Sequence, residues 1–266
     1  IAGPTTDYTT RLSETISGAS YSSGMATYTF RAKIPSEATG SYAMEFEGYV
    51  NTTVVKGGDM QSTFVQRDAI DNVVKYFAVT GSAVVPRRTV ASIANCNVCH
   101  DKLQPHGGNR NQIEACVICH NPTATDAARR PATALPTEAI DMQILIHKIH
   151  TGENLTNGYT VYGFGGSANN FAEVRFPGDR RDCVKCHVGT SYTVPLPAGV
   201  QPAVTPRNYW TPTPPISAAC LACHDSVSAA AHAFLNIATF GTTQAEACPV
   251  CHREAADFAV TRVHAR

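Results

Sequence analysis

Alternating apolar and polar residues mark three segments in the first third of the chain, at residues 28–34, 42–50 and 73–79. Each segment is rich in aromatic and β-branched residues, and a period of two is typical of strands with one face in water. Glycine, serine, threonine and proline separate the segments, as turns require. The pattern predicts a small antiparallel all-β domain, a sandwich or split barrel, over residues 1–90 with a core of its own.

A helical pattern stands out later in the chain, at residues 137–151. Apolar residues fill most of its projection, and Asp141 and Lys148 form a narrow polar stripe, so this helix should be buried on nearly all sides. Thr137 is the expected N-cap and Gly152 the expected stop. The rest of residues 91–266 has little regular patterning, and residues 194–216 alone contain seven prolines. We expect a second domain of short helices and long loops.

Cysteine placement indicates what fills this second domain. All ten cysteines fall in five Cys-x-x-Cys-His runs, at residues 96–100, 116–120, 183–187, 220–224 and 248–252. Two thiols one helical turn apart can bond the two vinyl groups of a haem, while the adjacent histidine reaches the iron. The runs predict five covalent haem c groups that form the core of residues 91–266. Their attachment residues would be Cys96, Cys99, Cys116, Cys119, Cys183, Cys186, Cys220, Cys223, Cys248 and Cys251, with His100, His120, His187, His224 and His252 as the proximal iron ligands.

Other uses of these cysteines explain the pattern less well. A thioredoxin-like redox pair would need a βαβ context and no following histidine. Structural zinc takes Cys₄ or Cys₂His₂ sets built from two such runs, and five runs do not divide into pairs. Five disulfides are typical of much shorter chains and give no reason for a histidine after each pair.

The histidine count indicates the coordination of these haems. The chain has ten histidines, and the five outside the runs, one for each iron, are His106, His147, His150, His232 and His264. Axial methionine is the competing ligand, but among four methionines only Met142 lies in the haem region, in an apolar helical pattern that favours packing. We expect bis-His, low-potential haems with no open position for a substrate. The chain would then be an electron-transfer protein without catalytic residues, rather than an enzyme.

His147 and His150 add a geometric expectation. They lie three residues apart on the predicted helix, so their side chains leave the same side, roughly 5–6 Å from each other. One iron that already holds a motif histidine has a single axial site left. The helix should therefore supply ligands to two different haems and hold them as neighbours.

Location and charge follow from the cofactor. No segment approaches the about 18 apolar residues of a membrane-spanning helix, and the chain starts at Ile1 without a signal peptide pattern, so we expect that a leader has been removed. Haem c attachment requires export, to the periplasm or beyond.

The 21 basic and 21 acidic side chains indicate no nucleic-acid partner. Five ferric haems with ionised propionates would bring the net charge to about −5. Candidate propionate partners are the arginine pairs at residues 87–88, 129–130 and 180–181, with solvated surface arginines as the alternative.

Several segments resemble the OmcA/MtrC family of outer-membrane multihaem cytochromes. The likeness runs from about residue 40 onward, through residues 40–42, 47–49, 76–81, 106–110, 119–122, 146–150, 176–183 and 263–266. The resemblance implies bis-His c-type haems, a β-domain beside each pentahaem domain, and the same five distal histidines. It also implies a role at the outer cell surface or outside the cell. There the protein would pass respiratory electrons to metal oxides, flavins or other cytochromes. Typical members are decahaem proteins with two such halves and a lipid anchor, and this chain resembles one half.

Three functions are therefore considered. An extracellular electron conduit accounts for every cysteine and histidine, and we favour it. A homopolymeric filament subunit would join its haems across interfaces between copies of the chain. A multihaem reductase would need a haem without its distal ligand, often with lysine in place of the motif histidine, and the sequence shows neither feature.

Overall fold

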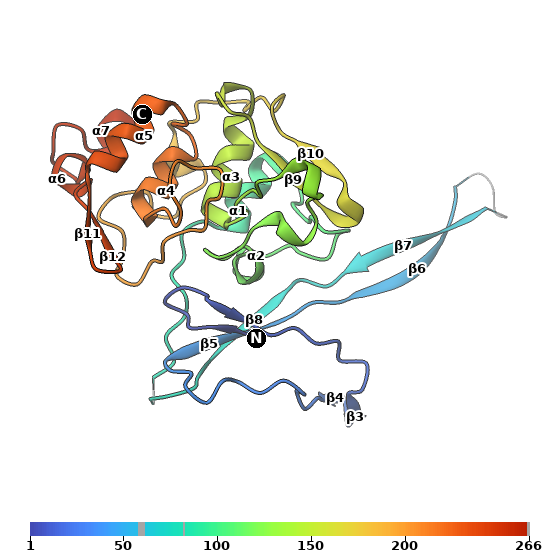
Figure 1. Cartoon of the computed structure of the whole chain (residues 1–266). Coiled ribbons are helices and arrows are strands. Elements are labelled where there is room, and N and C mark those ends of the chain that lie inside the picture. The colour runs from blue at the N-terminus through green and yellow to red at the C-terminus, as the bar shows by residue number, and fades with distance from the viewer. Residues whose placement is uncertain (58–61, 82, 265–266) are drawn as a thin grey trace.

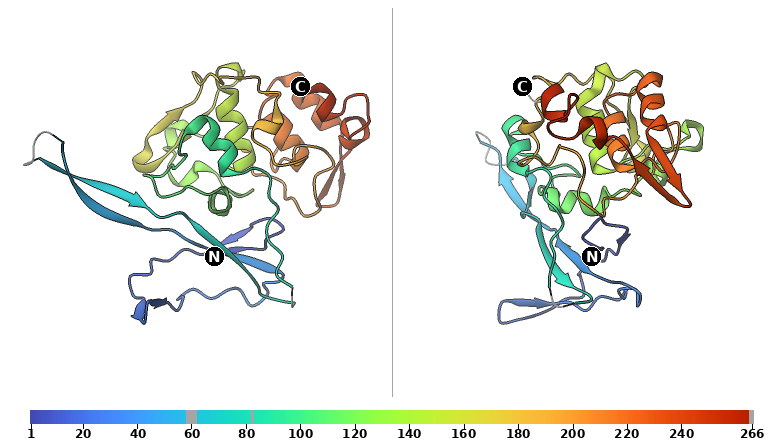
Figure 2. Two further views of the ribbon diagram at one scale, coloured as in Figure 1. Left: turned by 180° about the vertical axis from the view of Figure 1, so that it is seen from behind. Right: turned by 90° about the vertical axis from the view of Figure 1, so that its left-hand side faces the viewer.

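The computed structural model describes residues 1–57, 62–81 and 83–264. A β part formed by the first 80 residues lies beside a helical part formed by the rest (Figure 1). A long two-stranded ribbon projects from the β part, and it points away from the body in both views of Figure 2. The fold is multidomain, with small antiparallel sheets in one part and short helices with long loops in the other.

The β part is organised around one four-stranded antiparallel sheet in the order β2-β1-β5-β8. The longest strand pair of this sheet is β5 with β8. Ser41 lies opposite Ala78 at one end of the pair, and Phe46 lies opposite Val73 at the other. Beyond this pair the same two segments of the polypeptide continue as the projecting ribbon of β6 and β7, which is a separate two-stranded sheet. The strands are β1 (Ala2–Gly3), β2 (Thr10–Arg11), β3 (Ser20–Ser22), β4 (Met25–Thr27), β5 (Ser41–Phe46), β6 (Tyr49–Val55), β7 (Thr63–Ala69) and β8 (Val73–Ala78).

The predicted strands agree with this sheet only in part. The segment 73–79 corresponds to β8, whereas 42–50 is split between β5 and β6 by a break at Glu47 and Gly48. The segment 28–34 is not a strand, because the Glu14 carboxylate accepts the backbone N–H groups of Arg31 and Ala32, at 3.0 and 2.6 Å. A side chain thus takes the place of a neighbouring strand. β7 was not predicted, since most of it is exposed on both faces and shows no alternation.

The helical part contains seven short helices. Two small hairpins, β9 (Thr160–Tyr162) with β10 (Ala168–Asn170) and β11 (Ile237–Phe240) with β12 (Thr243–Glu246), accompany them. Among the described residues, no helix is long and apolar enough to cross a membrane. The helices are α1 (Ile93–His100), α2 (Ile113–Cys119), α3 (Met142–Thr151), α4 (Pro215–Leu221), α5 (Val227–Leu235), α6 (Pro249–His252) and α7 (Val260–Val263).

Helix α3 begins four residues later than predicted. Asp141, not Thr137, is the N-cap, because its carboxylate accepts the backbone N–H groups of Gln143 and Ile144, at 3.0 and 3.3 Å. Gly152 ends the helix as expected, with φ 45°. No residue of α3 is exposed, which confirms that the helix is buried on nearly all sides.

The core of the β part is shared with the helical part. Ala2, Tyr8 and Ala43 form one buried cluster with Val117 and Ile118 of α2. The sheet therefore packs directly against the second Cys-x-x-Cys-His run. The expectation that residues 1–90 have a core of their own is wrong at this point, because the sheet completes its apolar face with α2.

Candidate haem sites

Each histidine of a Cys-x-x-Cys-His run faces one of the five other histidines. The ring centroids of the five pairs lie between 5.9 and 6.2 Å apart. The pairs join residues that are 14 to 50 positions apart in sequence, so the fold creates them. They are His100 with His150, His106 with His120, His147 with His187, His224 with His264, and His232 with His252.

This spacing suits one iron between two imidazole rings. A bond between a metal and an imidazole nitrogen is about 2 Å long, so two rings on opposite sides of one ion have centroids roughly 6 Å apart. None of the ten cysteines forms a disulfide. Among the described residues, no three histidine, cysteine or acidic side chains come together as a metal site. Two histidines per site with a nearby thiol pair are the donors that a c-type haem requires.

Hydrogen bonds orient several of these rings. A ligand histidine usually donates its second ring N–H to an oxygen, which fixes its tautomer and leaves the other nitrogen for the metal. Nδ1 of His120 lies 2.7 Å from the carbonyl oxygen of Ile140, and Nδ1 of His252 lies 3.0 Å from that of Phe258. Nδ1 of His150 has the same relation to Ile146 within α3, at 2.9 Å. In these rings Nε2 remains as the nitrogen that could hold iron.

The attachment runs differ in local structure. The first run ends α1, whose N-cap Ser92 accepts the N–H of Asn95 at 3.2 Å. The second run lies on α2 and the fifth on α6, whereas the fourth begins in α4 and continues past its end. The third run starts in a 3₁₀ turn, Cys183–Lys185. Each backbone is helical or turned, so both thiols and the histidine of a run are kept within one short segment.

Helix α3 contributes one histidine to each of two pairs. Its His147 faces His187 of the third run, and its His150 faces His100 of the first run. Burial, and then the neighbouring His187, lower the pKa of His147 to about 4. The imidazole is neutral at neutral pH, which is the form that binds a metal.

The runs also contact one another. Asn95, just before the first run, donates to the carbonyl oxygen of Cys186 in the third run at 3.2 Å. Thr151, at the end of α3, donates to the Sγ atom of Cys223 in the fourth run at 3.2 Å. Glu246, two residues before the fifth run, accepts the N–H of Ser217 in α4 at 2.6 Å. The backbone oxygen of Thr151 also accepts a hydrogen bond from Arg180, three residues before the third run, at 3.3 Å, so the third run lies near both the first and the fourth.

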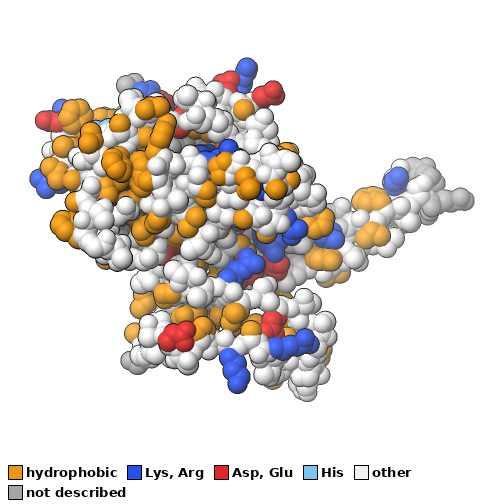
Figure 3. All heavy atoms as spheres, in the orientation of Figure 1, with side chains coloured by type: hydrophobic (Ala, Val, Ile, Leu, Met, Phe, Trp, Pro, Cys, Tyr) orange, Lys and Arg blue, Asp and Glu red, His pale blue; other side chains and the backbone are white. Residues whose placement is uncertain are grey.

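His232 and His264 connect the last two runs crosswise. His232 lies on α5, just after the fourth run, but faces His252 of the fifth. His264, at the end of α7 and beyond the fifth run, faces His224 of the fourth. Ala265 and Arg266 of the predicted C-terminal motif lie outside the described residues. Figure 3 shows apolar side chains gathered over the helices α4 to α7 that carry these residues.

Most of the candidate propionate arginines have partners within the protein. Arg180 donates to the backbone oxygen of Thr151 at 3.3 Å and pairs with no carboxylate among the described residues. Arg129 lies over the ring of Phe164. The other four are paired with carboxylates: Arg87 and Arg88 with Asp7, Arg130 with Asp126, and Arg181 with Asp179.

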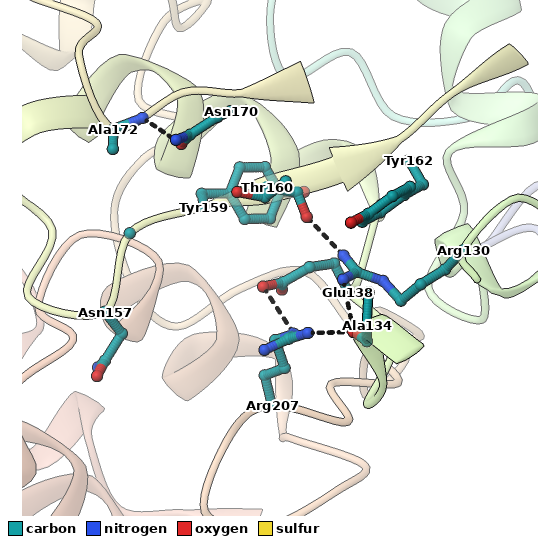
Figure 4. A pocket seen from close by; sticks show the side chains of 11 residues that line it. Arg130, Ala134, Glu138, Asn157, Tyr159, Thr160, Tyr162, Asn170, Ala172 and Arg207 are labelled. Carbon is teal, nitrogen blue, oxygen red and sulfur yellow. Dashed lines mark hydrogen bonds and ion pairs between the residues drawn. The ribbon is translucent and has the colours of Figure 1, made fainter. Parts of the chain in front are cut away.

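A polar cavity of about 460 Å³ lies away from the histidine pairs. Figure 4 shows Glu138 bonded to Arg207 and Arg130 bonded to the backbone of Ala134 and Thr160. These interactions satisfy the charged groups of its wall from within the protein. This network, which connects the loop before α3 to β9, was not predicted from the sequence.

The chain is similar to a known family and to two solved structures. Residues 88–265 match the sequence model of a family described as outer membrane cytochrome MtrC/MtrF-like, domains II/IV. Among solved structures, the crystal structure of the outer membrane decahaem cytochrome OmcA is 19% identical, with a TM-score of 0.41, and the match covers 82% of this chain and 38% of that chain. The crystal structure of MtrC from Shewanella baltica OS185 is 16% identical, with a TM-score of 0.46, and the match covers 89% of this chain and 38% of that one.

The match is partial in length. The chain spans well under half of each of these two solved chains. A search of curated proteins finds no match. The family match alone covers most of the chain and contains all five runs and all ten histidines. The chain therefore belongs to the family of MtrC/MtrF-like outer-membrane cytochromes.

Proposed function

We propose that this chain is a pentahaem c-type cytochrome that conducts electrons through five bis-His haems. The observation that carries the proposal is the pairing of every motif histidine with one other histidine at about 6 Å between centroids. Each bound haem would take up and release one electron at its iron. With both axial positions held by histidine, the protein supports electron transfer rather than bond formation at the metal.

Contacts between the runs support a single row of haems. The second run is followed by the first, since His106 lies only six residues after His100 and faces His120. The first and third runs both face histidines of α3. Thr151 bonds to Cys223 of the fourth run and to Arg180 just before the third run. The histidine that follows the fourth run faces the fifth run, and the histidine that follows the fifth run faces the fourth. The proposed order is second, first, third, fourth and fifth. One end of the row lies at the β part, and the other lies at α5 and α6, which carry His232 and His252.

Family membership supports the setting of this activity. We propose an exported protein at the outer cell surface or in the extracellular space. Its acceptors would be metal oxides, flavins or other multihaem cytochromes. The protein acts by outer-sphere transfer, without a substrate site.

Intact mass and carbon monoxide binding test the proposal. The holoprotein, produced with the haem c maturation system, should carry five covalent haems. Changing both cysteines of one run to serine should remove one haem. The reduced protein should be low spin and show negligible carbon monoxide binding at neutral pH. A mass with fewer haems, or binding to a stoichiometric share of them, would overturn the pentahaem or the bis-His assignment, respectively.

A further inference from the structure

His106 differs from the other four histidines that face a run. His147 and His150 lie on α3, His232 lies on α5, and His264 caps α7, so a helix positions each of them. His106 lies outside any helix or strand. Its φ is 57°, a left-handed conformation that a residue with a side chain rarely adopts. Local structure alone does not hold this imidazole toward His120.

Two buried asparagines clamp the segment that follows His106. The backbone N–H of Asn72 donates to Oδ1 of Asn111 at 2.9 Å, and the backbone N–H of Asn111 donates to Oδ1 of Asn72 at 2.8 Å. The side-chain amides complete the clamp, since Nδ2 of Asn72 donates to the Asn109 carbonyl and Nδ2 of Asn111 to that of Ile70. The two residues are only 6% and 4% exposed. Their four hydrogen bonds would be costly to leave unmade in this buried position.

Charged side chains reinforce the same contact. Arg110 forms an ion pair with Glu47 at 2.6 Å. Arg67 lies beside Gly107, since a Cβ atom added to this glycine would be 3.4 Å from Nη1 of Arg67. Glu47 and Asn72 lie at the break where the β5 and β8 pair passes into the β6 and β7 ribbon. The His106 segment is therefore fastened to the β part at this break.

The β part also fixes the other side of the same site. Val117 and Ile118, the two residues between Cys116 and Cys119, lie in the cluster that contains Ala43 of β5. One sheet thus contacts the run that carries His120, and its edge holds the segment that carries His106. Motion of the sheet would move both together.

We propose that Asn72 and Asn111 are positioning residues that hold His106 on the iron of the haem attached to Cys116 and Cys119. The β part thereby sets the axial ligation at one end of the haem row. This inference rests on the bis-His ligation of the proposed function. Without the clamp, the left-handed segment would relax and release its imidazole, while the helix-borne ligands of the other four haems would stay in place.

Carbon monoxide binding to the reduced holoprotein tests the inference. In Asn72→Ala and in Asn111→Ala, one haem of five should bind carbon monoxide about tenfold faster than in the wild type, as the loss of a buried hydrogen bond implies. His106→Ala marks the haem concerned, because it should open the same site fully. Added imidazole should restore the low-spin spectrum in all three variants.

Asn169→Ala is the matched control. Its side chain also donates two hydrogen bonds to backbone oxygens, those of Val161 and Ser167, but it lies on the β10 hairpin. The variant should behave as the wild type. If the alanine variants yield no holoprotein, carbon monoxide binding is measured in Asn111→Asp instead. This variant keeps the Oδ1 acceptor for the N–H of Asn72 and loses the donor to the Ile70 carbonyl oxygen, so one haem should again bind carbon monoxide faster than in the wild type.

The outcomes separate the two proposals. An unchanged spectrum in His106→Ala would overturn the ligand assignment itself. An open site in His106→Ala, together with Asn72 and Asn111 variants that match Asn169→Ala, would leave the bis-His haem intact and overturn the positioning role. Carbon monoxide binding at several haems in the asparagine variants would also overturn it, because the clamp contacts one site.

Discussion

At the scale of single residues, Gly152 combines a backbone and a packing requirement. Its φ of 45° ends α3, and a Cβ placed there would lie 2.8 Å from the Cβ atom of Val174 and closer still to the Val174 carbonyl oxygen. That carbonyl already accepts the N–H of Glu153 at 3.1 Å. The end of the helix that carries two candidate ligands is therefore set by a residue without a side chain.

Gly152→Ala should be strongly destabilising. The left-handed conformation costs about 1–2 kcal/mol with a side chain, and the collision with Val174 adds to this cost. Gly241→Ala is the control, because its φ is 61° and nothing lies within 4 Å of the added atom. Denaturant unfolding of the holoprotein should show a larger loss at position 152, and equal losses would contradict the close contact.

Asp141 should make stability depend on pH. Burial raises the pKa of this N-cap carboxyl to about 6 from 3.8. The folded state therefore binds this proton more tightly than the unfolded state, and the contribution is complete below pH 3.8 and is lost as pH rises through about 6. Asn can also cap a helix and does not ionise. Unfolding measured from pH 4 to pH 7 should show a smaller decline for Asp141→Asn than for wild type, and parallel curves would contradict this origin.

At the scale of elements, the sequence pattern predicted those features of α3 that depend on residues close together in the chain. The apolar face of α3, its stop at Gly152 and the shared side of His147 and His150 all follow from a period of 3.6 residues. Its start did not, because residues 138–140 bond to an earlier segment instead: the N–H of Glu138 donates to the Asp126 carboxylate at 2.8 Å, and that of Ile140 to the Ala124 carbonyl oxygen at 2.9 Å. The pairs of histidines could be counted but not matched, since their partners lie up to 50 residues apart.

The same limit applies to the β part. β8 alternates and was predicted, but β6 and β7 expose most of both faces and carry mixed residues. The hydrogen bonds between Asn72 and Asn111 could not be predicted from the sequence, because only the folded structure brings these two segments together. Tertiary contacts, rather than strand propensity, determine these elements.

Helix α3 makes a prediction about its two histidines. His147→Ala should make one haem five-coordinate and leave four low spin, and His150→Ala should affect a different haem, since their partners are His187 and His100. Magnetic circular dichroism of each variant and of the double variant would measure this. Two high-spin haems are expected in the double variant, and one alone would mean that both histidines serve the same iron.

At the scale of the whole molecule, the cofactors would change the charge of the protein. The amino-acid sequence is neutral, with 21 basic and 21 acidic side chains and an isoelectric point of about 7.2. Most of the arginines expected to neutralise propionates are instead paired with carboxylates of the protein. These paired arginines therefore have less charge to offer a propionate.

The holoprotein should focus as an acidic protein. Five ferric haems with ionised propionates add about −5, so the isoelectric point should fall clearly below 7.2. Full reduction adds one further negative charge for each haem. Isoelectric focusing of the oxidised and reduced forms checks both steps, and focusing near the value of the amino-acid sequence would mean that the propionates are protonated or that haems are missing.

The crosswise histidine pairs have a consequence for chain entropy. With the proposed ligation, each pair closes a loop, and the loops are nested: residues 106 to 120 lie within 100 to 150, and residues 232 to 252 lie within 224 to 264. The closure of an inner loop shortens the free chain of the outer one, so the outer bond forms at a lower entropic cost. No pair joins residues 100–187 to residues 224–264. The ligated polypeptide would therefore contain two separately cross-linked networks, joined by the intervening chain and by noncovalent contacts such as that of Thr151 with Cys223, and denaturant should release iron ligands from them in two steps.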